Sequence, residues 1–169
     1  MMGIYSSIED SIEKANSIII RRKHLAEAAG NIITRSVHVD RSRAFQEVID
    51  ATGRIQHVDR NIIEMIPQAE GDDVDIFFLK FSHRMNDKLL EEEHERHKFI
   101  SADPYSLATF NEADPSFADE CSNITHWEKN GEWFCIIFMM LNCKRVVGIV
   151  RSRGEWYDDC WFACRRPYR

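Results

Sequence analysis

The stretch NITHWEKNGEWFCIIF, residues 123–138, decides the fold because it places Asn130-Gly131 between two runs of β-type residues. An Asn-Gly pair supports the positive φ angles of a two-residue hairpin turn, so the two runs are predicted to pair as antiparallel strands. Such a turn sets Trp127 opposite Phe134, and an aromatic pair at facing positions stabilises the register. The last third of the chain is therefore predicted to be β-rich.

The sequence after this hairpin continues in the same pattern. The run WFCIIFMML is apolar on both faces, which indicates a strand covered on both sides. The pair Arg153-Gly154 is expected to form a second tight turn, which leads into the last strand. A β-meander of four antiparallel strands is therefore predicted for residues 121–169. The segment VDIFFLKF, residues 74–81, could add a fifth strand at an edge.

The N-terminal part carries apolar residues at steps of three and four, which is the spacing of an amphipathic helix. One helix is predicted from Ser7 to about Arg35. A second is predicted from Asp40, which can cap its first turn, to Pro67. Residues 1–67 are thus expected to form an antiparallel helical hairpin that packs on the sheet and could also pair with a second copy. The predicted fold class is a single α+β domain over residues 1–169.

The two parts are joined by a middle region of mixed character. Residues 74–100 are predicted to form the edge strand and a surface helix, which Ser82 or Asn86 can cap. Residues 101–120 contain two Asp-Pro pairs among polar and acidic residues, and both pairs favour turns. This segment is therefore predicted to be a long connecting loop.

The word His-Val-Asp-Arg occurs twice, at residues 38–41 and 57–60. Within the predicted second helix the two copies would lie roughly 28 Å apart and on different faces, so they could not share a substrate. We interpret Asp40 as a helix cap, and His57 and Asp59 as residues that flank an apolar stripe.

The net charge of −6 is distributed unevenly along the chain. Residues 71–130 hold 6 basic and 14 acidic side chains, a net charge of −8, whereas residues 131–169 hold 7 and 4, a net charge of +3. Because an acidic middle region repels phosphate backbones, general nucleic-acid binding is disfavoured.

Other features predict a cytoplasmic protein without a membrane anchor. The first residues, MMGIYSSIED, lack the apolar core of a signal peptide, and the longest apolar run has about half the length of a membrane span. The five cysteines form an odd set without a CxxC pair, which indicates reduced thiols rather than a disulfide framework.

The last predicted strand, EWYDDCWFACR, carries the candidate binding residues. Alternation places a mixture of aromatic, arginine and acidic side chains on one of its faces, a composition that is enriched at binding hot spots. The alternative is that surface elements cover this face and bury Trp161. The predicted Arg153-Gly154 turn also sets Arg151 against Trp156, close enough for a cation–π contact. The candidate partner-binding residues are Arg151, Trp156, Tyr157, Asp159, Trp161 and Arg165.

The predicted surface helix carries Glu93, His94 and His97, which could meet on one helix surface. Zinc accepts such ligands, but the metalloprotease spacing His-Glu-x-x-His is absent. We interpret the three residues as a solvated, salt-bridged face, and whether they ever bind a metal stays open. No metal site and no cofactor are predicted.

Two functional hypotheses follow. In the first, the protein is a non-enzymatic regulator or inhibitor that presents its acidic middle region to a basic partner protein and anchors it with the aromatic and arginine surface. In the second, it is a small ribonuclease-like enzyme with a histidine base beside an arginine-rich sheet. The acidic balance argues against the enzyme, so binding is favoured. The residues of the enzyme hypothesis are His126, Arg145, Arg151, Arg153, Arg165, Arg166 and Tyr168.

Overall fold

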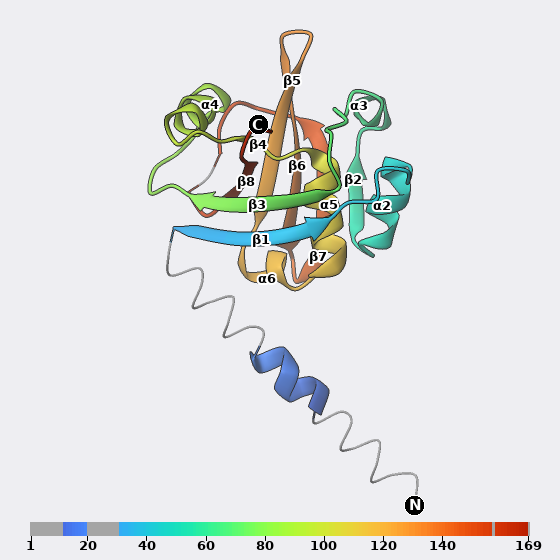
Figure 1. The fold of residues 1–169 in the computed structure, drawn as a ribbon. Coiled ribbons are helices and arrows are strands. Elements are labelled where there is room, and N and C mark those ends of the chain that lie inside the picture. Colours follow the sequence, from blue (N-terminus) through green and yellow to red (C-terminus); the bar gives the residue numbers. More distant parts are fainter. Residues whose placement is uncertain (1–11, 20–30, 157, 169) are drawn as a thin grey trace, which may run out of the picture.

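The protein is built on a mixed sheet of eight strands, seen in a computed structural model that describes residues 12–19, 31–156 and 158–168 (Figure 1). The strand order is β1-β3-β8-β5-β6-β7-β2, and β4 pairs with β8 off this path. The strands are β1 (Ile32–His38), β2 (Ile55–Val58), β3 (Asp73–Lys80), β4 (Ile100–Ser101), β5 (Asn123–Lys129), β6 (Glu132–Leu141), β7 (Lys144–Arg151) and β8 (Trp161–Arg165). The helices are residues 12–19, α2 (Phe45–Ala51), α3 (Arg60–Ile63), α4 (Asp87–Arg96), α5 (Pro104–Ala113) and α6 (Phe117–Glu120).

The hairpin predicted at Asn130-Gly131 is confirmed. Both turn residues have positive φ angles, 57° for Asn130 and 78° for Gly131. The strands β5 and β6 pair antiparallel, with Trp127 opposite Phe134. The rings of these two residues are stacked at 6.0 Å between centroids, so the aromatic pair supports the register as expected.

The prediction of an antiparallel meander of four to five strands is wrong. Strand β8 does not follow β7 in the sheet but lies between β3 and β5, and it runs parallel to β5. Strand β2 is parallel to β7. Gly154 has a φ of 80°, but the chain leaves the sheet there, and Trp156 forms an isolated bridge with Met85. The alternating pattern of residues 155–165 predicts one strand, but within this stretch β8 comprises Trp161–Arg165.

The predicted helical hairpin over residues 1–67 is also wrong. Residues 12–19 are helical, but 1–11 and 20–30 lie outside the described residues, and the end of the predicted first helix is strand β1. The predicted second helix is divided into α2, β2 and α3. Gly53, with a φ of 64°, lies just after α2, where its left-handed backbone conformation ends the helix.

The repeated word His-Val-Asp-Arg marks the same local structure twice, where a strand ends and the chain turns. Asp40 follows β1 and its carboxylate accepts a hydrogen bond from the backbone N–H of Ser42 at 3.0 Å. Asp59 follows β2 and accepts from the N–H of Asn61, also at 3.0 Å, which caps α3. Each aspartate therefore stabilises a turn. The interpretation of Asp40 as a helix cap is wrong, because the N-cap of α2 is Ala44, and Asp59 caps α3 rather than flanking a helix stripe.

The predicted loop over residues 101–120 instead contains α5 and α6, and α5 is central to the fold. Asp103 caps α5, and Pro104 occupies its first turn. The helix packs against β1, β3, β5 and α2. Its Phe110 meets Phe78 of β3 at 5.1 Å and Phe117 of α6 at 5.0 Å between ring centroids, and both partner rings are fully buried. The principal core therefore lies between α5 and one face of the sheet.

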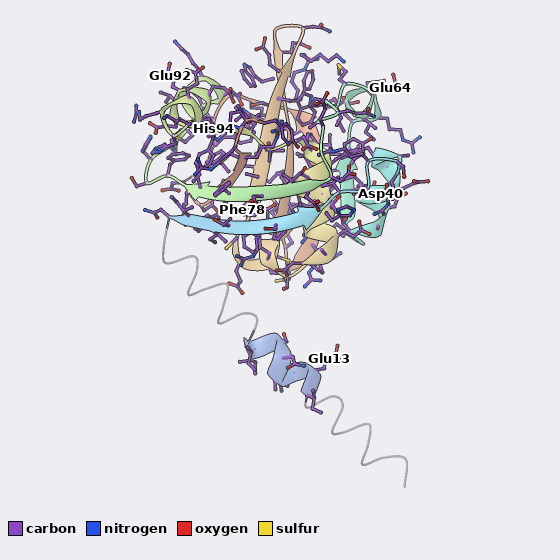
Figure 2. All side chains as sticks on the ribbon, in the orientation of Figure 1. Glu13, Asp40, Glu64, Phe78, Glu92 and His94 are labelled. Atoms are coloured by element: carbon purple, nitrogen blue, oxygen red, sulfur yellow. The ribbon has the colours of Figure 1, made fainter. Side chains whose placement is uncertain are left out.

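Helix α4 covers part of the opposite face. Asn86 caps it by accepting a hydrogen bond from the N–H of Leu89, as the sequence predicted. On its inner side Leu90 joins a second apolar cluster with Ile124 and Phe162. Figure 2 shows His94 on the side of α4 toward the sheet, with Glu92 on the outer side. Within the described residues, every helix is too short or too polar to cross a membrane.

We expect Phe78→Ala to lower the free energy of unfolding by about 3–5 kcal/mol, because it removes a ring that is fully buried between α5 and α6. The matched control is Phe77→Ala, which truncates the neighbouring, partly exposed ring on the other face of β3 and should cost roughly 1–2 kcal/mol. Urea unfolding followed by circular dichroism measures both. Equal losses would contradict the placement of the core.

We expect Asp103→Ala to destabilise the protein by about 2–4 kcal/mol, because it removes the cap of α5 and a charged partner of Arg41. The carboxylate accepts from the Ser106 N–H at 3.1 Å and from both terminal nitrogens of Arg41 at 3.0 and 3.3 Å. Asp59→Ala, at the cap of the one-turn helix α3, serves as the control and should cost about 0.5–1 kcal/mol. Urea midpoints of the two variants test this order.

Candidate functional site

The sheet face that carries α4 stays apolar beyond the edge of that helix. Alternate residues of β6 point to opposite faces, so Phe134, Ile136 and Phe138 belong to the α5 core. The residues between them face the α4 side, where Cys135 and Ile137 belong to the second apolar cluster. Val150 of β7 is directly opposite Cys135, yet 41% of its surface is exposed. The cover provided by α4 therefore stops before β7.

A groove of about 700 Å³ follows this uncovered face. Its floor is formed by side chains of β6 and β7, and Trp156, in the segment after β7, lines it as well. Its polar lining residues include two arginines and one glutamate. The residues that line it include Ile137, Met139, Val150, Arg151, Arg153, Glu155 and Trp156.

Gly148 shapes the floor of this face. It is opposite Ile137 in the β6–β7 pair, and a Cβ atom built on it would lie 3.2 Å from Cγ2 of Ile137. The absence of a side chain at Gly148 therefore leaves room for the side chain of Ile137 on the floor of the groove.

Two of the six predicted partner-binding residues, Arg151 and Trp156, line the groove. The expected pairing between them does not occur, because Arg151 pairs with Phe134 and forms an ion pair with Glu132 at 2.9 Å. The indole N–H of Trp156 instead donates a hydrogen bond to Asp87 at 3.3 Å. Arg151 and Trp156 thus line the same groove but are held in place by different partners.

The other predicted residues do not join them. Trp161 has only 1% of its surface exposed and belongs to the α5 core, so its ring is not available to a partner. Asp159 is exposed and lines a separate pocket beside Lys80. Tyr157 lies outside the described residues. The surface inferred from strand alternation is therefore not one continuous face.

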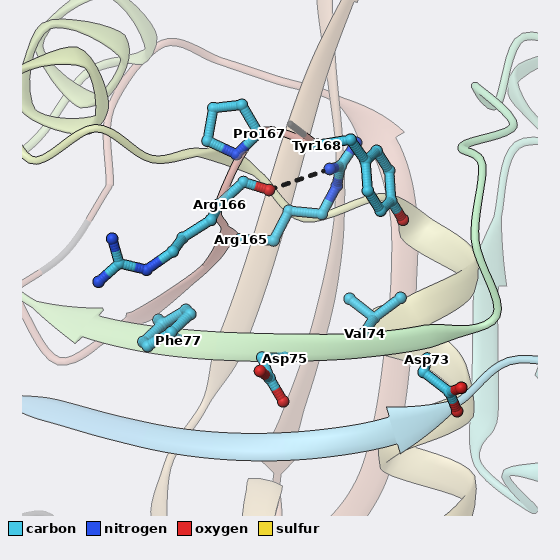
Figure 3. Close-up of a pocket in the computed structure, with 8 residues that line it drawn as sticks. All are labelled: Asp73, Val74, Asp75, Phe77, Arg165, Arg166, Pro167 and Tyr168. Carbon is cyan, nitrogen blue, oxygen red and sulfur yellow. Dashed lines mark hydrogen bonds between the residues drawn. The ribbon is translucent and has the colours of Figure 1, made fainter.

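Arg165 lies at the end of β8, and the C-terminal residues that follow it lie alongside β3 (Figure 3). Its guanidinium lies 4.3 Å from the centre of the Tyr168 ring and donates a hydrogen bond to the carbonyl of Arg166 at 3.2 Å. These residues line a pocket of about 260 Å³ together with Asp73 and Asp75 of β3. Arg165 therefore helps to attach the C-terminal segment to the sheet.

Two residues of the ribonuclease hypothesis, His126 and Arg165, line the same cleft, but the other residues of that hypothesis do not line it. Both ring nitrogens of His126 are taken by carboxylates, Asp87 and Glu91, each at 2.7 Å. Arg145 is paired with Asp119 on the edge of the fold, and Arg151 with Glu132. Among the described residues, then, these arginines pair with acidic side chains rather than surround the histidine.

Residues Glu93, His94 and His97 do not meet on one helix surface. Glu93, whose side chain is only 16% exposed, forms ion pairs with two exposed residues, Arg96 at 2.8 Å and His97 at 3.6 Å. His94 points the other way and is buried. Its partners are Glu91, one turn before it, and His126 of β5, a combination that sequence reasoning missed. The signal was present in the i, i+3 spacing of Glu91 and His94.

Comparison with known proteins finds no matching family model, no matching curated protein and no matching solved structure. What the chain does must therefore be inferred from its own geometry.

Proposed function

We propose that the protein is a protein-binding regulator whose groove over β6 and β7 receives an amphipathic helix of a partner protein. The observation that carries this proposal is the apolar groove itself, which continues the cluster beneath α4 onto a part of the sheet that no described residue covers. Contiguous apolar patches that remain exposed on a folded protein are typical of interaction sites.

A helix is the occupant that fits this part of the sheet. A sheet face is covered by another layer of secondary structure, and α4 already forms half of such a layer over β5 and β8. Packed helices lie about 8–10 Å apart, so a second helix beside α4 would rest on β6 and β7. Apolar side chains at helical spacing could then contact Ile137, Met139 and Val150.

The charges at the groove favour a partner with acidic flanks. Two arginines and one glutamate line the groove, namely Arg151, which is paired with Glu132, Arg153 and Glu155, and residues 131–169 carry a net charge of +3. Many carboxylates of the acidic middle region are taken up within the fold, where Asp103 pairs with Arg41 and Asp119 with Arg145. We therefore place the docking surface at the groove rather than on the acidic region, and the partner is acidic rather than basic.

A displayed library of amphipathic helical peptides, selected against the full chain, tests this proposal. We expect binders that combine apolar residues at helical spacing with acidic flanks. Val150→Glu, which puts a charge on the exposed floor, should weaken their binding by about 10–30-fold, and Arg153→Glu should weaken it in a salt-dependent way. Fluorescence anisotropy of purified peptides measures the affinities.

The control is Ile32→Glu, which changes an exposed isoleucine of β1, at the other edge of the sheet, and should leave the affinity unchanged. Selected peptides that bind Val150→Glu as tightly as the unmodified chain would overturn the proposal, as would a selection without binders. A second copy is the competing occupant, because Ile12, Ile18 and Ile19 are exposed on the helix of residues 12–19. Dimerisation that Val150→Glu abolishes, without peptide binding, would identify that occupant instead.

A further inference from the structure

A buried cluster of ionisable side chains joins α4 to β5. His126 has 2% of its surface exposed, and its ring is stacked on Trp133 at 4.6 Å between centroids. Its Nδ1 lies 2.7 Å from Oδ1 of Asp87, and its Nε2 lies 2.7 Å from Oε1 of Glu91. Carboxylates from successive turns of α4 thus hold this histidine at both ring nitrogens.

His94 completes the cluster from the same helix. Its Nδ1 lies 3.7 Å from Oε1 of Glu91 and 3.4 Å from Oγ of Ser101. Its Nε2 is buried and has no hydrogen-bond partner among the described residues, which is unusual for a side chain that is 99% buried. One nitrogen of a neutral imidazole offers a lone pair, so the unpartnered His94 can act as a metal ligand.

We infer that Glu91, His94 and His126 bind a divalent transition-metal ion of the zinc type. One ligand atom from each residue lies within 4.8 Å of the other two, so a single ion can reach all three after small side-chain shifts. Two histidines and one glutamate form a ligand set that zinc accepts. This ion site is separate from the groove over β6 and β7, and the inference does not rest on the function proposed for that groove.

In such a site, Asp87 would act as a positioning residue for His126. A histidine that ligates a metal usually donates its other ring N–H to a carboxylate, which fixes the tautomer and the orientation of the ring. The Nδ1–H of His126 donates to Asp87 in this way, leaving Nε2, on the side of Glu91, for the ion. The carboxylate–histidine arrangement is therefore already present.

The charge of the cluster also fits a divalent cation. Two carboxylates, the buried Asp87 and the partly exposed Glu91, each lie 2.7 Å from a ring nitrogen of His126. A divalent cation held between Glu91, His94 and His126 would balance the two negative charges of these carboxylates.

The ion would remain accessible from outside. Glu91 and His126 line a cleft of about 390 Å³, together with Ser101 and Trp133. Three protein ligands that leave a position open to a cleft are the arrangement of catalytic zinc sites, whereas structural sites are closed by four. The fourth position here would be filled by water or by a small ligand from the cleft.

Metal-depleted full chain, titrated with Zn²⁺ in a calorimeter and with Co²⁺ by visible absorption, tests the inference. We expect one ion per chain at the site. Glu91→Gln and His94→Gln should weaken binding by about 100-fold, and Asp87→Asn by about 10–100-fold. The matched controls are Glu92→Gln and His97→Gln, which change the same residue types on the exposed side of α4 and should leave affinity unchanged.

Absence of Zn²⁺ and Co²⁺ binding by the unmodified chain would overturn the inference whatever the variants do. So would binding that Glu92→Gln or His97→Gln weakens as much as His94→Gln does. A thiolate charge-transfer band in the Co²⁺ spectrum would place the ion on cysteine and would also overturn it, and Cys143, the exposed cysteine, is the first to replace in that case. Circular dichroism separates loss of the site from loss of the fold, and a rise in melting temperature with Zn²⁺ should be absent in Glu91→Gln.

Discussion

The carboxylate of Asp87 is the constraint on which the α4 side of the molecule depends. It accepts hydrogen bonds from His126 of β5 at 2.7 Å, from Ser152 after β7 at 2.6 Å, and from the indole of Trp156 at 3.3 Å. Asp87 is also the first residue of α4. One buried group therefore fixes the start of the helix, the histidine of the cluster and a lining residue of the groove.

Such a group is stable only because its partners are complete. Burial by itself would raise the pKa of Asp87, but hydrogen bonds from His126 and Ser152 outweigh it and hold the pKa below its usual value. His126 shows the same balance. Burial acts to lower its pKa, but the hydrogen bonds and charges of Asp87 and Glu91 outweigh burial and hold the pKa above its usual value. A buried ion pair of this kind adds little net stability, yet removing one partner leaves an uncompensated charge and is strongly destabilising. The network thus specifies how α4 docks more than it strengthens the fold.

The sequence predicts what is local and fails where distant segments compete. The Asn130-Gly131 hairpin, the Asn86 cap of α4 and a strand close to residues 74–81 follow from neighbouring residues and are confirmed. The edge position predicted for that strand is wrong, because β3 lies between β1 and β8. The insertion of β8 between β3 and β5 depends on which apolar faces match across the whole chain, and alternation in residues 155–165 carries no such information. In residues 40–67, apolar residues at steps of three and four are compatible with one long helix and also with the short elements α2, β2 and α3. Gly53 is the residue whose type indicates that a helix ends there.

The candidate sites illustrate the same limit. Arg151 and Trp156 were found because aromatic and arginine residues are enriched at interfaces, but the groove they line depends on where α4 stops. Asp87 and His126 are 39 residues apart, so no spacing rule joins them.

The contact between Asp87 and His126 also links the two candidate sites, because the groove residue Trp156 and the proposed ligand His126 donate hydrogen bonds to the same oxygen of Asp87. If a helix in the groove displaced Trp156, the environment of that oxygen would change, and an ion on Nε2 of His126 would polarise the hydrogen bond from His126 to the same oxygen. By thermodynamic linkage, any effect of one ligand on the affinity of the other is reciprocal.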